Sequence, residues 1–320
     1  MAHSTLFADP ALTLQTHNYR GRFAPSPTGP LHFGSLIAAV ASYLEARSND
    51  GHWLVRMEDI DTAREVPGAA DDILFTLEQF GFAWDESVIY QSKRQTEYAA
   101  ALERLVKKVL VYPCFCSRKE IADSAMHGLD GLVYPGICRN GAQVKPGRNP
   151  AIRIKVPASY IGFSDELQGE IGQHLVDEIG DFVLKRADCF YAYQLAVVVD
   201  DSAQQITHVL RGADLIDSTP RQIYLQQALG FTKPHYAHVP VATNAQGEKL
   251  SKTTLANPLD RTKPVLSIWQ ALDFLGQSPP QDLQTASLPA LWDWAKTHWQ
   301  LSKVPALRHQ IVQESKSRQF

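Results

Sequence analysis

The sequence predicts an α/β fold in which buried strands alternate with amphipathic helices, and three stretches carry this prediction. Residues 22–44 form a short apolar segment, a turn rich in Pro and Gly, and then apolar residues at three- and four-residue intervals. This is the pattern of a strand, a turn and a helix. Residues 53–61 are apolar and then acidic, which is typical of a buried strand that ends at a ligand crevice. Residues 191–201 are almost continuously apolar, which indicates a strand or helix buried on both faces.

The composition is that of an ordinary globular protein. The chain has 320 residues, 44% of them hydrophobic and 20% charged, which is enough for one large or two ordinary domains. Its formal net charge of -3 does not indicate a nucleic-acid binder, although a local basic stripe is compatible with that value. Residues 1–19 lack the pattern of a signal peptide, and no segment approaches the ~18 apolar residues of a membrane span. We therefore expect a cytoplasmic protein without membrane contact.

The turn between the first strand and the first helix is suited to a phosphate group. Prolines and Gly29 set its path, and His32 and Gly34 are expected in the first helical turn. Unpaired N–H groups and the positive end of the helix dipole favour a triphosphate there. The same field favours a neutral imidazole that donates one hydrogen bond to a phosphoryl oxygen, and Gly34 would let an adenine ring approach the backbone. An isolated HxG sequence, however, is more often a simple helix cap.

A second stretch far along the chain accompanies this turn. The sequence KLSKT at residues 249–253 follows a Gly-containing turn. The two stretches together resemble the HIGH and KMSKS signatures of class I aminoacyl-tRNA synthetases, and RFAPSPTG followed by LHFGS is similar to the glutamyl branch of that class. HFGS differs from HIGH at its second and fourth positions, so the role of the family's last histidine is not carried over to Ser35.

This resemblance implies a Rossmann-type class I synthetase catalytic domain that activates L-glutamate with ATP and Mg²⁺. The implied catalytic residues are His32, Gly34, Lys249 and Lys252, of which His32, Gly34 and Lys252 would contact ATP. The implied L-glutamate site consists of Arg22, Phe23, Ala24, Pro25, Ser26, Glu58, Tyr193 and Arg211.

Within that site the resemblance gives Glu58 to the substrate's α-amino group. Arg22 and Arg211 would take the two carboxylates in either order, because a guanidinium pairs with a carboxylate through two parallel hydrogen bonds. Without the resemblance, Glu58 is a solvated strand end or a helix cap, and Arg211 is a surface charge.

A group of cysteines marks a separate feature. Cys114 and Cys116 are one residue apart, and Tyr134 and Cys138 follow a Gly-rich loop. Two thiolates in a tight turn and a third that returns later complete a tetrahedron with one oxygen or nitrogen ligand. The alternative is a set of reduced loop cysteines, because CxC alone is a weak signal. The arrangement resembles the zinc insertion of glutamyl-branch members that modify a tRNA base, which implies one structural Zn²⁺ with Tyr134 as fourth ligand and His127 as its rival.

The expected organisation follows from these motifs. An N-terminal extension (1–18) precedes the first half of the catalytic domain (19–113), the zinc-binding insertion (114–150), the second half (151–245), and the KLSKT loop with a helical stem-contact-like region (246–320). Cys189 is expected to be a core cysteine.

The acceptor of the glutamyl group follows from two departures from full-length glutamyl enzymes. Residues 254–320 are too few for their helical anticodon-binding part, and RGADL at residues 211–215 replaces their usual RGEDH. The resemblance then implies transfer of glutamate to the queuosine base at the wobble position of tRNA(Asp), and we expect a monomer. Two alternatives remain: a truncated glutamyl-tRNA synthetase that charges a tRNA 3′ end, and a catalytically inactive paralogue that binds nucleotide or RNA.

Lys252 gives a direct test of the KLSKT stretch. If this stretch closes over the triphosphate, Lys252→Ala should lower glutamate-dependent pyrophosphate exchange by a factor of about 10² or more, the scale of losing one preorganised charge donor. Near-normal exchange in a folded variant would remove Lys252 from the mechanism.

Overall fold

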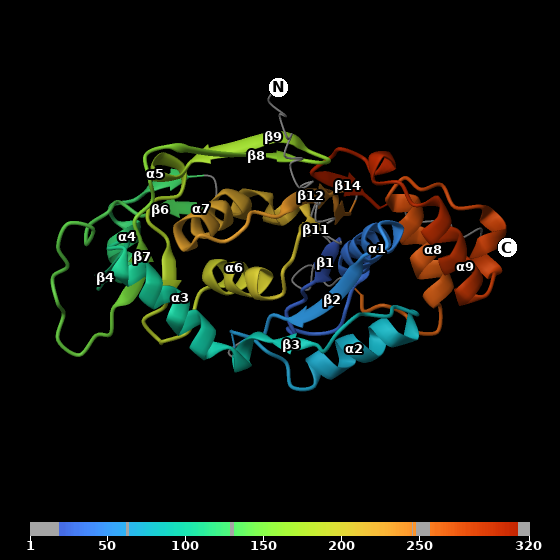
Figure 1. The fold of residues 1–320 in the computed structure, drawn as a ribbon, viewed down its shortest axis with the longest axis horizontal. Coiled ribbons are helices and arrows are strands. Elements are labelled where there is room, and N and C mark those ends of the chain that lie inside the picture. The colour runs from blue at the N-terminus through green and yellow to red at the C-terminus, as the bar shows by residue number, and fades with distance from the viewer. Residues whose placement is uncertain (1–18, 62–63, 129–130, 245, 248–256, 313–320) are drawn as a thin grey trace, which may run out of the picture.

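The computed structural model describes residues 19–61, 64–128, 131–244, 246–247 and 257–312 (Figure 1). Its strands are β1 (Arg20–Phe23), β2 (His52–Met57), β3 (Ile89–Tyr90), β4 (Val111–Cys114), β5 (Met126–Gly128), β6 (Gly131–Val133), β7 (Ala151–Ile154), β8 (Tyr160–Asp165), β9 (Gly169–His174), β10 (Val183–Lys185), β11 (His208–Gly212), β12 (His235–Val239), β13 (Val241–Thr243) and β14 (His309–Ile311). Its α-helices are α1 (Phe33–Ser48), α2 (Ala69–Gln79), α3 (Gln95–Lys107), α4 (Arg118–Ala122), α5 (Leu175–Glu178), α6 (Tyr193–Ala203), α7 (Thr219–Leu229), α8 (Pro264–Phe274) and α9 (Leu288–His298).

Parallel strands at the centre of the molecule decide where a ligand can bind. β1 pairs with β2 and β2 pairs with β3, all in parallel, and β11 pairs in parallel with β12. The N–H of Thr207 donates to the carbonyl of Arg20 at 3.0 Å, which brings β11 against the free edge of β1. The resulting strand order is β3-β2-β1-β11-β12. From β1 the chain first adds strands on one side of β1 and later adds β11 and β12 on the other side, so the strand order reverses between β1 and β11. Open α/β sheets bind ligands at such a reversal, outside the carboxyl ends of the strands.

Helix α1 lies against these central strands and fixes the geometry of the reversal. Its buried face includes Leu36, Val40 and Leu44, at the helical spacing that the sequence predicts, so the strand, turn and helix over residues 22–44 are confirmed. A cluster of rings then attaches α9 to α1. The ring of Trp292 lies 5.0 Å from that of Tyr43 and 5.0 Å from that of Phe82, centroid to centroid.

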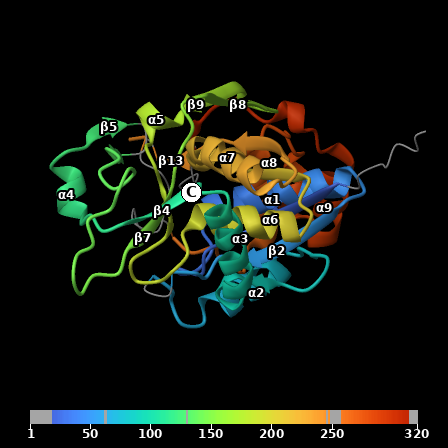
Figure 2. The same ribbon diagram turned by 60° about the vertical axis from the view of Figure 1, so that its left-hand side comes forward.

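A second hydrophobic core lies between α3, α6 and α7, which the turned view shows side by side (Figure 2). The apolar run at residues 191–201, expected as a strand or a helix, lies mainly in α6. It is buried on both faces because it packs between helices and strands. The end of α6 carries Asp200 and Asp201, whose side chains are also buried.

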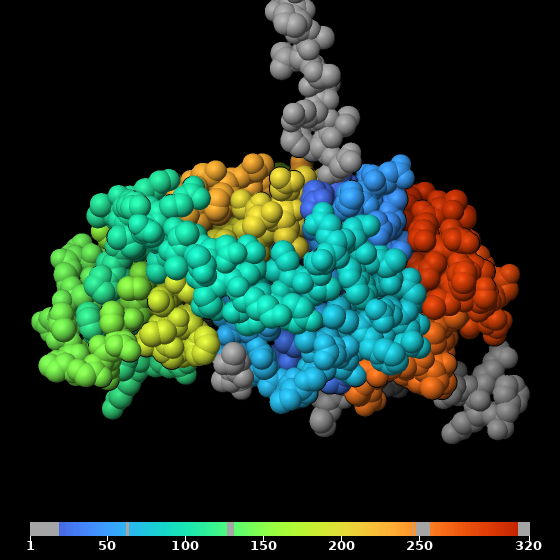
Figure 3. Space-filling model, turned by 60° about the horizontal axis from the view of Figure 1, so that its bottom comes forward, coloured from blue at the N-terminus to red at the C-terminus, as the bar shows by residue number. Residues whose placement is uncertain are grey.

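The two peripheral parts lie at opposite ends of the molecule (Figures 1 and 3). At one end, β4, β7 and β10 form an antiparallel sheet from which residues 115–128 and 131–150 extend. At the other end, α8 and α9 pack on α1 through the hydrophobic core that includes Leu36, Val40 and Trp292. No helix among the described residues is both long and apolar enough to cross a membrane.

The prediction that Cys189 is a core cysteine is wrong. Its side chain is exposed, and its backbone has a φ of 72°, in the left-handed region that tight turns require. The N–H of Cys189 donates to the carbonyl of Arg186 at 3.0 Å, which closes a turn before Phe190. A short apolar-looking segment thus turns at the surface and does not enter the core.

Candidate active site

A cleft of about 580 Å³ lies at the reversal between β1 and β11. Ten residues that the sequence predicts for L-glutamate and ATP line this cleft: Arg22, Phe23, Ala24, Pro25, Ser26, His32, Gly34, Glu58, Tyr193 and Arg211. The strand ends, the start of α1 and the start of α6 therefore bring together residues that are far apart in the sequence. Lys249 and Lys252, the other two predicted catalytic residues, lie outside the described part of the chain.

His32 is the N-cap of α1 and also lines the cleft. The N–H of Ser35 donates to His32 Nδ1 at 3.3 Å, so Nδ1 carries a lone pair and the neutral ring has its proton on Nε2. Nε2 lies 3.2 Å from the hydroxyl oxygen of Ser35. The helix-cap interpretation and the phosphate interpretation of this histidine are therefore compatible, because they use different ring nitrogens.

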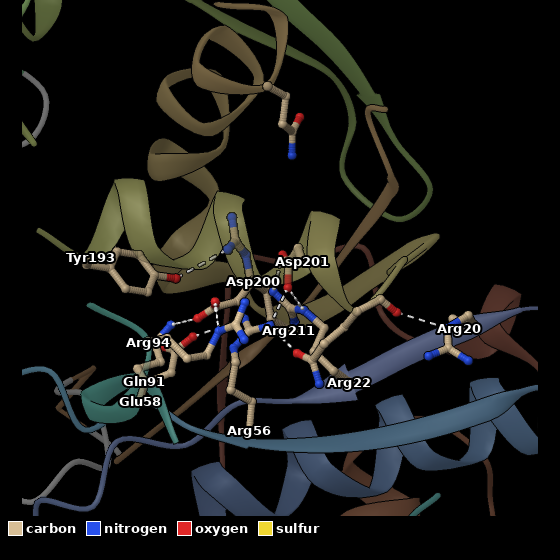
Figure 4. A network of polar contacts seen from close by, with 12 residues as sticks. Arg20, Arg22, Arg56, Glu58, Gln91, Arg94, Tyr193, Asp200, Asp201 and Arg211 are labelled. Carbon is tan, nitrogen blue, oxygen red and sulfur yellow. Dashed lines mark hydrogen bonds and ion pairs between the residues drawn. The ribbon is translucent and has the colours of Figure 1, made fainter. Parts of the chain in front are cut away.

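Behind the cleft, Asp201 is the centre of a buried ion-pair network (Figure 4). Its carboxylate accepts from Arg22 Nε at 3.1 Å and Nη2 at 3.3 Å, and from Arg56 Nη1 at 2.8 Å. Arg56 also donates through Nη2 to Glu58 Oε1 at 3.2 Å. The Arg22 side chain is thus held on two of its nitrogens by a carboxylate of the protein itself.

Asp200 forms a neighbouring group with residues of the segment that leads into α3 (Figure 4). Arg94 Nε donates to it at 2.6 Å, Tyr98 Oη at 2.7 Å and Gln91 Nε2 at 2.8 Å. These contacts fasten the end of α6 to α3, through Tyr98, and to the segment before α3, through Gln91 and Arg94. The two adjacent aspartates therefore join β1, β2 and α3 to one helix end.

The network shifts the pKa values of two carboxyl groups in opposite directions. Burial alone would raise the pKa of Asp201, but the guanidinium groups of Arg22 and Arg56 outweigh it and hold the pKa below its ordinary value. Burial raises the pKa of Glu58, and the nearby Arg56 and Arg22 only partly offset that rise. A cation bound next to Glu58 would stabilise its ionised form.

Arg211 differs from Arg22 in its partners. Its Nε donates to His238 Nε2 at 3.1 Å, and its Nη2 donates to Thr219 Oγ1 at 2.9 Å and to the carbonyl of Leu215 at 3.3 Å. Its Nη1 donates to Tyr193 Oη at 3.4 Å (Figure 4). Within the described residues, no carboxylate forms an ion pair with this guanidinium group.

Several residues of this site do not follow from the motifs. Asp200, Asp201 and Arg56 belong to segments that the sequence points to, yet their buried pairing is visible only in the structure. A signal was present, because Arg56 interrupts an apolar strand and two aspartates end an apolar run, and buried charges need partners. His238, which accepts from Arg211 Nε, carries no comparable signal.

The predicted metal ligands meet in the insertion. Cys116 Sγ lies 3.6 Å from Cys138 Sγ, and Tyr134 Oη lies 3.3 Å from Cys114 Sγ and 3.8 Å from Cys116 Sγ. A tetrahedral Zn²⁺ with Zn–S bonds of about 2.3 Å needs sulfur atoms about 3.8 Å apart. The three thiols are close enough together to hold one ion.

Tyr134 Oη lies beside these three thiols. The N–H of Cys138 donates to Tyr134 Oη at 2.8 Å, and the guanidinium carbon of Arg153 lies 3.9 Å from the centre of the Tyr134 ring. Burial raises the pKa of the Tyr134 phenol, and the hydrogen bond from the Cys138 N–H offsets part of that rise. The side chain of His127, the rival ligand, lies outside the described part of the structure.

The Asp201 network makes stability depend on pH. Asp201→Asn should lower the free energy of unfolding at pH 7 by about 3–5 kcal/mol, because it leaves two buried guanidinium groups without their carboxylate. The pKa of Asp201 is lower in the folded than in the unfolded chain, so its contribution is present above about pH 4 and is lost as pH falls through the folded value.

Urea unfolding at pH 7 and at pH 3 measures the free energy of unfolding of the wild type and of Asp201→Asn. The loss of free energy caused by the substitution should be smaller at pH 3. The matched control is Asp188→Asn, which removes the exposed pair with Arg186 and should cost less than about 1 kcal/mol. An equal loss for Asp201→Asn at both pH values would contradict the assignment.

Comparisons with known proteins agree with this geometry. Residues 18–263 match the catalytic-domain model of class I tRNA synthetases for Glu and Gln. A protein of Dechloromonas aromatica named glutamyl-Q tRNA(Asp) synthetase is 58% identical over 290 residues, which cover 90% of this chain and 96% of that protein. A protein of Chromobacterium violaceum with the same name is 58% identical over 289 residues, with the same two coverages.

Solved structures extend the comparison to the fold. The crystal structure of a glutamate tRNA ligase from Elizabethkingia meningosepticum, in complex with its amino acid, superposes with a TM-score of 0.76 and 26% sequence identity. The superposition covers 92% of this chain and 67% of that one. The chain therefore belongs to the Glu and Gln family of class I tRNA synthetases and, within it, to the relatives named glutamyl-Q tRNA(Asp) synthetase.

Proposed function

We propose that this protein activates L-glutamate with ATP and transfers the glutamyl group to the queuosine base at the wobble position of tRNA(Asp). The observation that carries the proposal is the cleft at the strand reversal, where the start of α1 lies beside two arginines and Glu58. One such cleft offers a phosphate-binding helix end and the charges that an amino acid with two carboxylates needs.

In the first step, an oxygen of the glutamate α-carboxylate attacks the α-phosphorus of ATP, and pyrophosphate leaves. We assign the phosphates to the start of α1, with the Nε2 proton of His32 as a donor and Gly34 next to the adenosine. Lys249 and Lys252 would add positive charge from the KLSKT stretch, and Mg²⁺ would accompany ATP. These groups act by orientation and by stabilising the charge that develops on the phosphoryl oxygens.

The amino acid would lie on the other side of the cleft. Glu58 would accept from its ammonium group, which also offsets the cost of burying the Glu58 carboxylate. Arg22 and Arg211 would take its carboxylates, Tyr193 would donate to it, and the backbone of residues 23–26 would form the adjoining wall. A hydroxyl of the queuosine diol then attacks the carbonyl of the glutamyl adenylate, and AMP leaves.

The names of the relatives support the choice of acceptor. Two proteins of which the match covers 96%, at 58% identity, are named glutamyl-Q tRNA(Asp) synthetase. A single unstacked loop base is also a target that proteins can splay out and read. We assign contact with the tRNA stem to the region from residue 246 onward, which includes α8 and α9. We also propose that the enzyme acts as a monomer.

We further propose that the insertion at residues 114–150 holds one zinc ion on Cys114, Cys116, Tyr134 and Cys138. The supporting observations are the spacing of the three sulfur atoms and the position of Tyr134 Oη among them. Zinc in such a site supplies structural cross-linking, because four protein ligands leave no open position for a substrate.

The acceptor can be tested with purified tRNAs. We expect glutamate-dependent pyrophosphate exchange without any tRNA, and transfer of labelled glutamate to queuosine-containing tRNA(Asp) but not to tRNA(Glu). Periodate treatment of the queuosine diol should abolish the labelling. Labelling of tRNA(Glu) at its 3′ adenosine, or equal labelling of tRNA(Asp) without queuosine, would favour a truncated glutamyl-tRNA synthetase.

The zinc ligands can be tested by elemental analysis. Protein prepared without chelator should contain one zinc per chain, and Tyr134→Phe should lower the zinc content or the affinity for zinc. The paired variant His127→Ala should leave both unchanged. Absence of metal from the wild type, or loss of zinc from His127→Ala alone, would defeat the assignment.

A further inference from the structure

The two arginines of the cleft are held in different ways, and the difference bears on which of them is available to a ligand. Arg22 contacts Asp201 through Nε and Nη2, and Asp201 also pairs with Arg56. Arg211 has no direct contact with a carboxylate among the described residues, and its Nε donates to the imidazole of His238. Its Nη1 donates to the hydroxyl of Tyr193, and its Nη2 donates to the hydroxyl of Thr219 and to the carbonyl of Leu215.

Behind His238 lies Asp165, at the end of β8. Asp165 Oδ2 is 2.6 Å from His238 Nδ1, and neither side chain is exposed. The other oxygen, Oδ1, accepts the backbone N–H groups of Leu167 at 3.0 Å, Gln168 at 2.9 Å and His238 at 3.2 Å. An oxygen with so many donors identifies Asp165 as an ionised carboxylate.

These contacts define the tautomer of His238. Its Nδ1 must carry the proton, because it faces an ionised carboxylate oxygen. Its Nε2 must carry a lone pair, because the N–H at Nε of Arg211 points to it. Thr219 Oγ1 lies 3.4 Å from the same nitrogen, where its hydroxyl can only donate. Burial lowers the pKa of His238 to about 4, which agrees with a neutral ring at pH 7.

We propose that Asp165 and His238 are positioning residues that orient Arg211 as the main anchor for a substrate carboxylate. The buried chain of hydrogen bonds runs from Asp165 through the imidazole to Arg211 Nε. Together with the contacts of Nη2 to Thr219 and Leu215, it fixes the plane of the guanidinium group. Nη1, which contacts only Tyr193 Oη at 3.4 Å among the described residues, can therefore donate its second N–H to the ligand. A direct pair with Asp165 would occupy two of the three nitrogens, as Asp201 does with Arg22. This proposal rests on the proposed function, since it names how the glutamate site is built.

Two substitutions of His238 separate the two ends of its ring. Gln places a polar atom near the position of Nε2, so His238→Gln can still accept from Arg211. Asn places one near Nδ1, so His238→Asn keeps the contact with Asp165 and loses the one with Arg211. His238→Asn should raise the KM for glutamate about tenfold to a hundredfold, the effect of losing a hydrogen bond to a charged group. His238→Gln should recover most of that loss, and the KM for ATP should change little in either variant.

Asp165→Asn tests the tautomer. The Asn amide would donate to Nδ1, the imidazole proton would move to Nε2, and two N–H groups would then face each other at Arg211. The KM for glutamate should rise in this variant, with little added effect when it is combined with His238→Gln, because Gln has no nitrogen near Nδ1. The matched control is His235→Asn, at an exposed histidine of the same strand β12, which should leave both KM values unchanged.

Pyrophosphate exchange gives the KM values, thermal unfolding checks the fold, and ¹⁵N NMR reports which nitrogen of His238 is protonated. The proposal expects the proton on Nδ1 in the wild type and on Nε2 in Asp165→Asn. An Nε2 proton in the wild type, or an unchanged glutamate KM in folded His238→Asn, would overturn it. A wild type without glutamate-dependent exchange would instead reject the proposed function, while the NMR measurement would still decide whether the hydrogen-bond chain exists.

Discussion

The pairing of Asp201 with Arg22 and Arg56 is the interaction on which the rest of the cleft depends. Arg22 lies in β1 and Arg56 lies in β2, whereas Asp201 lies in α6, which comes much later in the chain. Three charges in a water-poor interior are stable only when their hydrogen bonds are made together. The network therefore fixes the distance between the first half of the sheet and α6, and Tyr193 and Arg211 are placed relative to Glu58 as a result.

The family resemblance names ten residues that line one cleft. The α/β class and the strand, turn and helix at residues 22–44 could be predicted from the sequence alone. These features depend on local spacing, because a motif at a strand end or a helix start keeps its place relative to that element. The family was also confirmed, since the motifs lie in the catalytic-domain match. The exposure of Cys189 was missed, because a turn with a positive φ has no sequence signature in that segment.

The partners of the buried charges could not be predicted. Asp201 is 179 residues from Arg22 in the sequence, and Asp165 is 73 residues from His238. Each pairing depends on where a helix or strand crosses the end of another element, and hydrophobic periodicity does not contain that information. A single histidine on a strand such as β12 is indistinguishable by pattern from one that only fills the core. The sequence can therefore locate a site more readily than it can explain how its charges are held.

The cap of α1 depends on the protonation state of His32. His32 receives the N–H of Ser35 on Nδ1, and this contact needs a lone pair. An imidazolium ion has none, so a proton taken up by this ring would remove the contact that begins the helix. It would also place a positive charge at the positive end of the helix dipole. The helix start and the proposed phosphate contact thus use different nitrogens of one ring, and that ring can serve both only while Nδ1 is unprotonated.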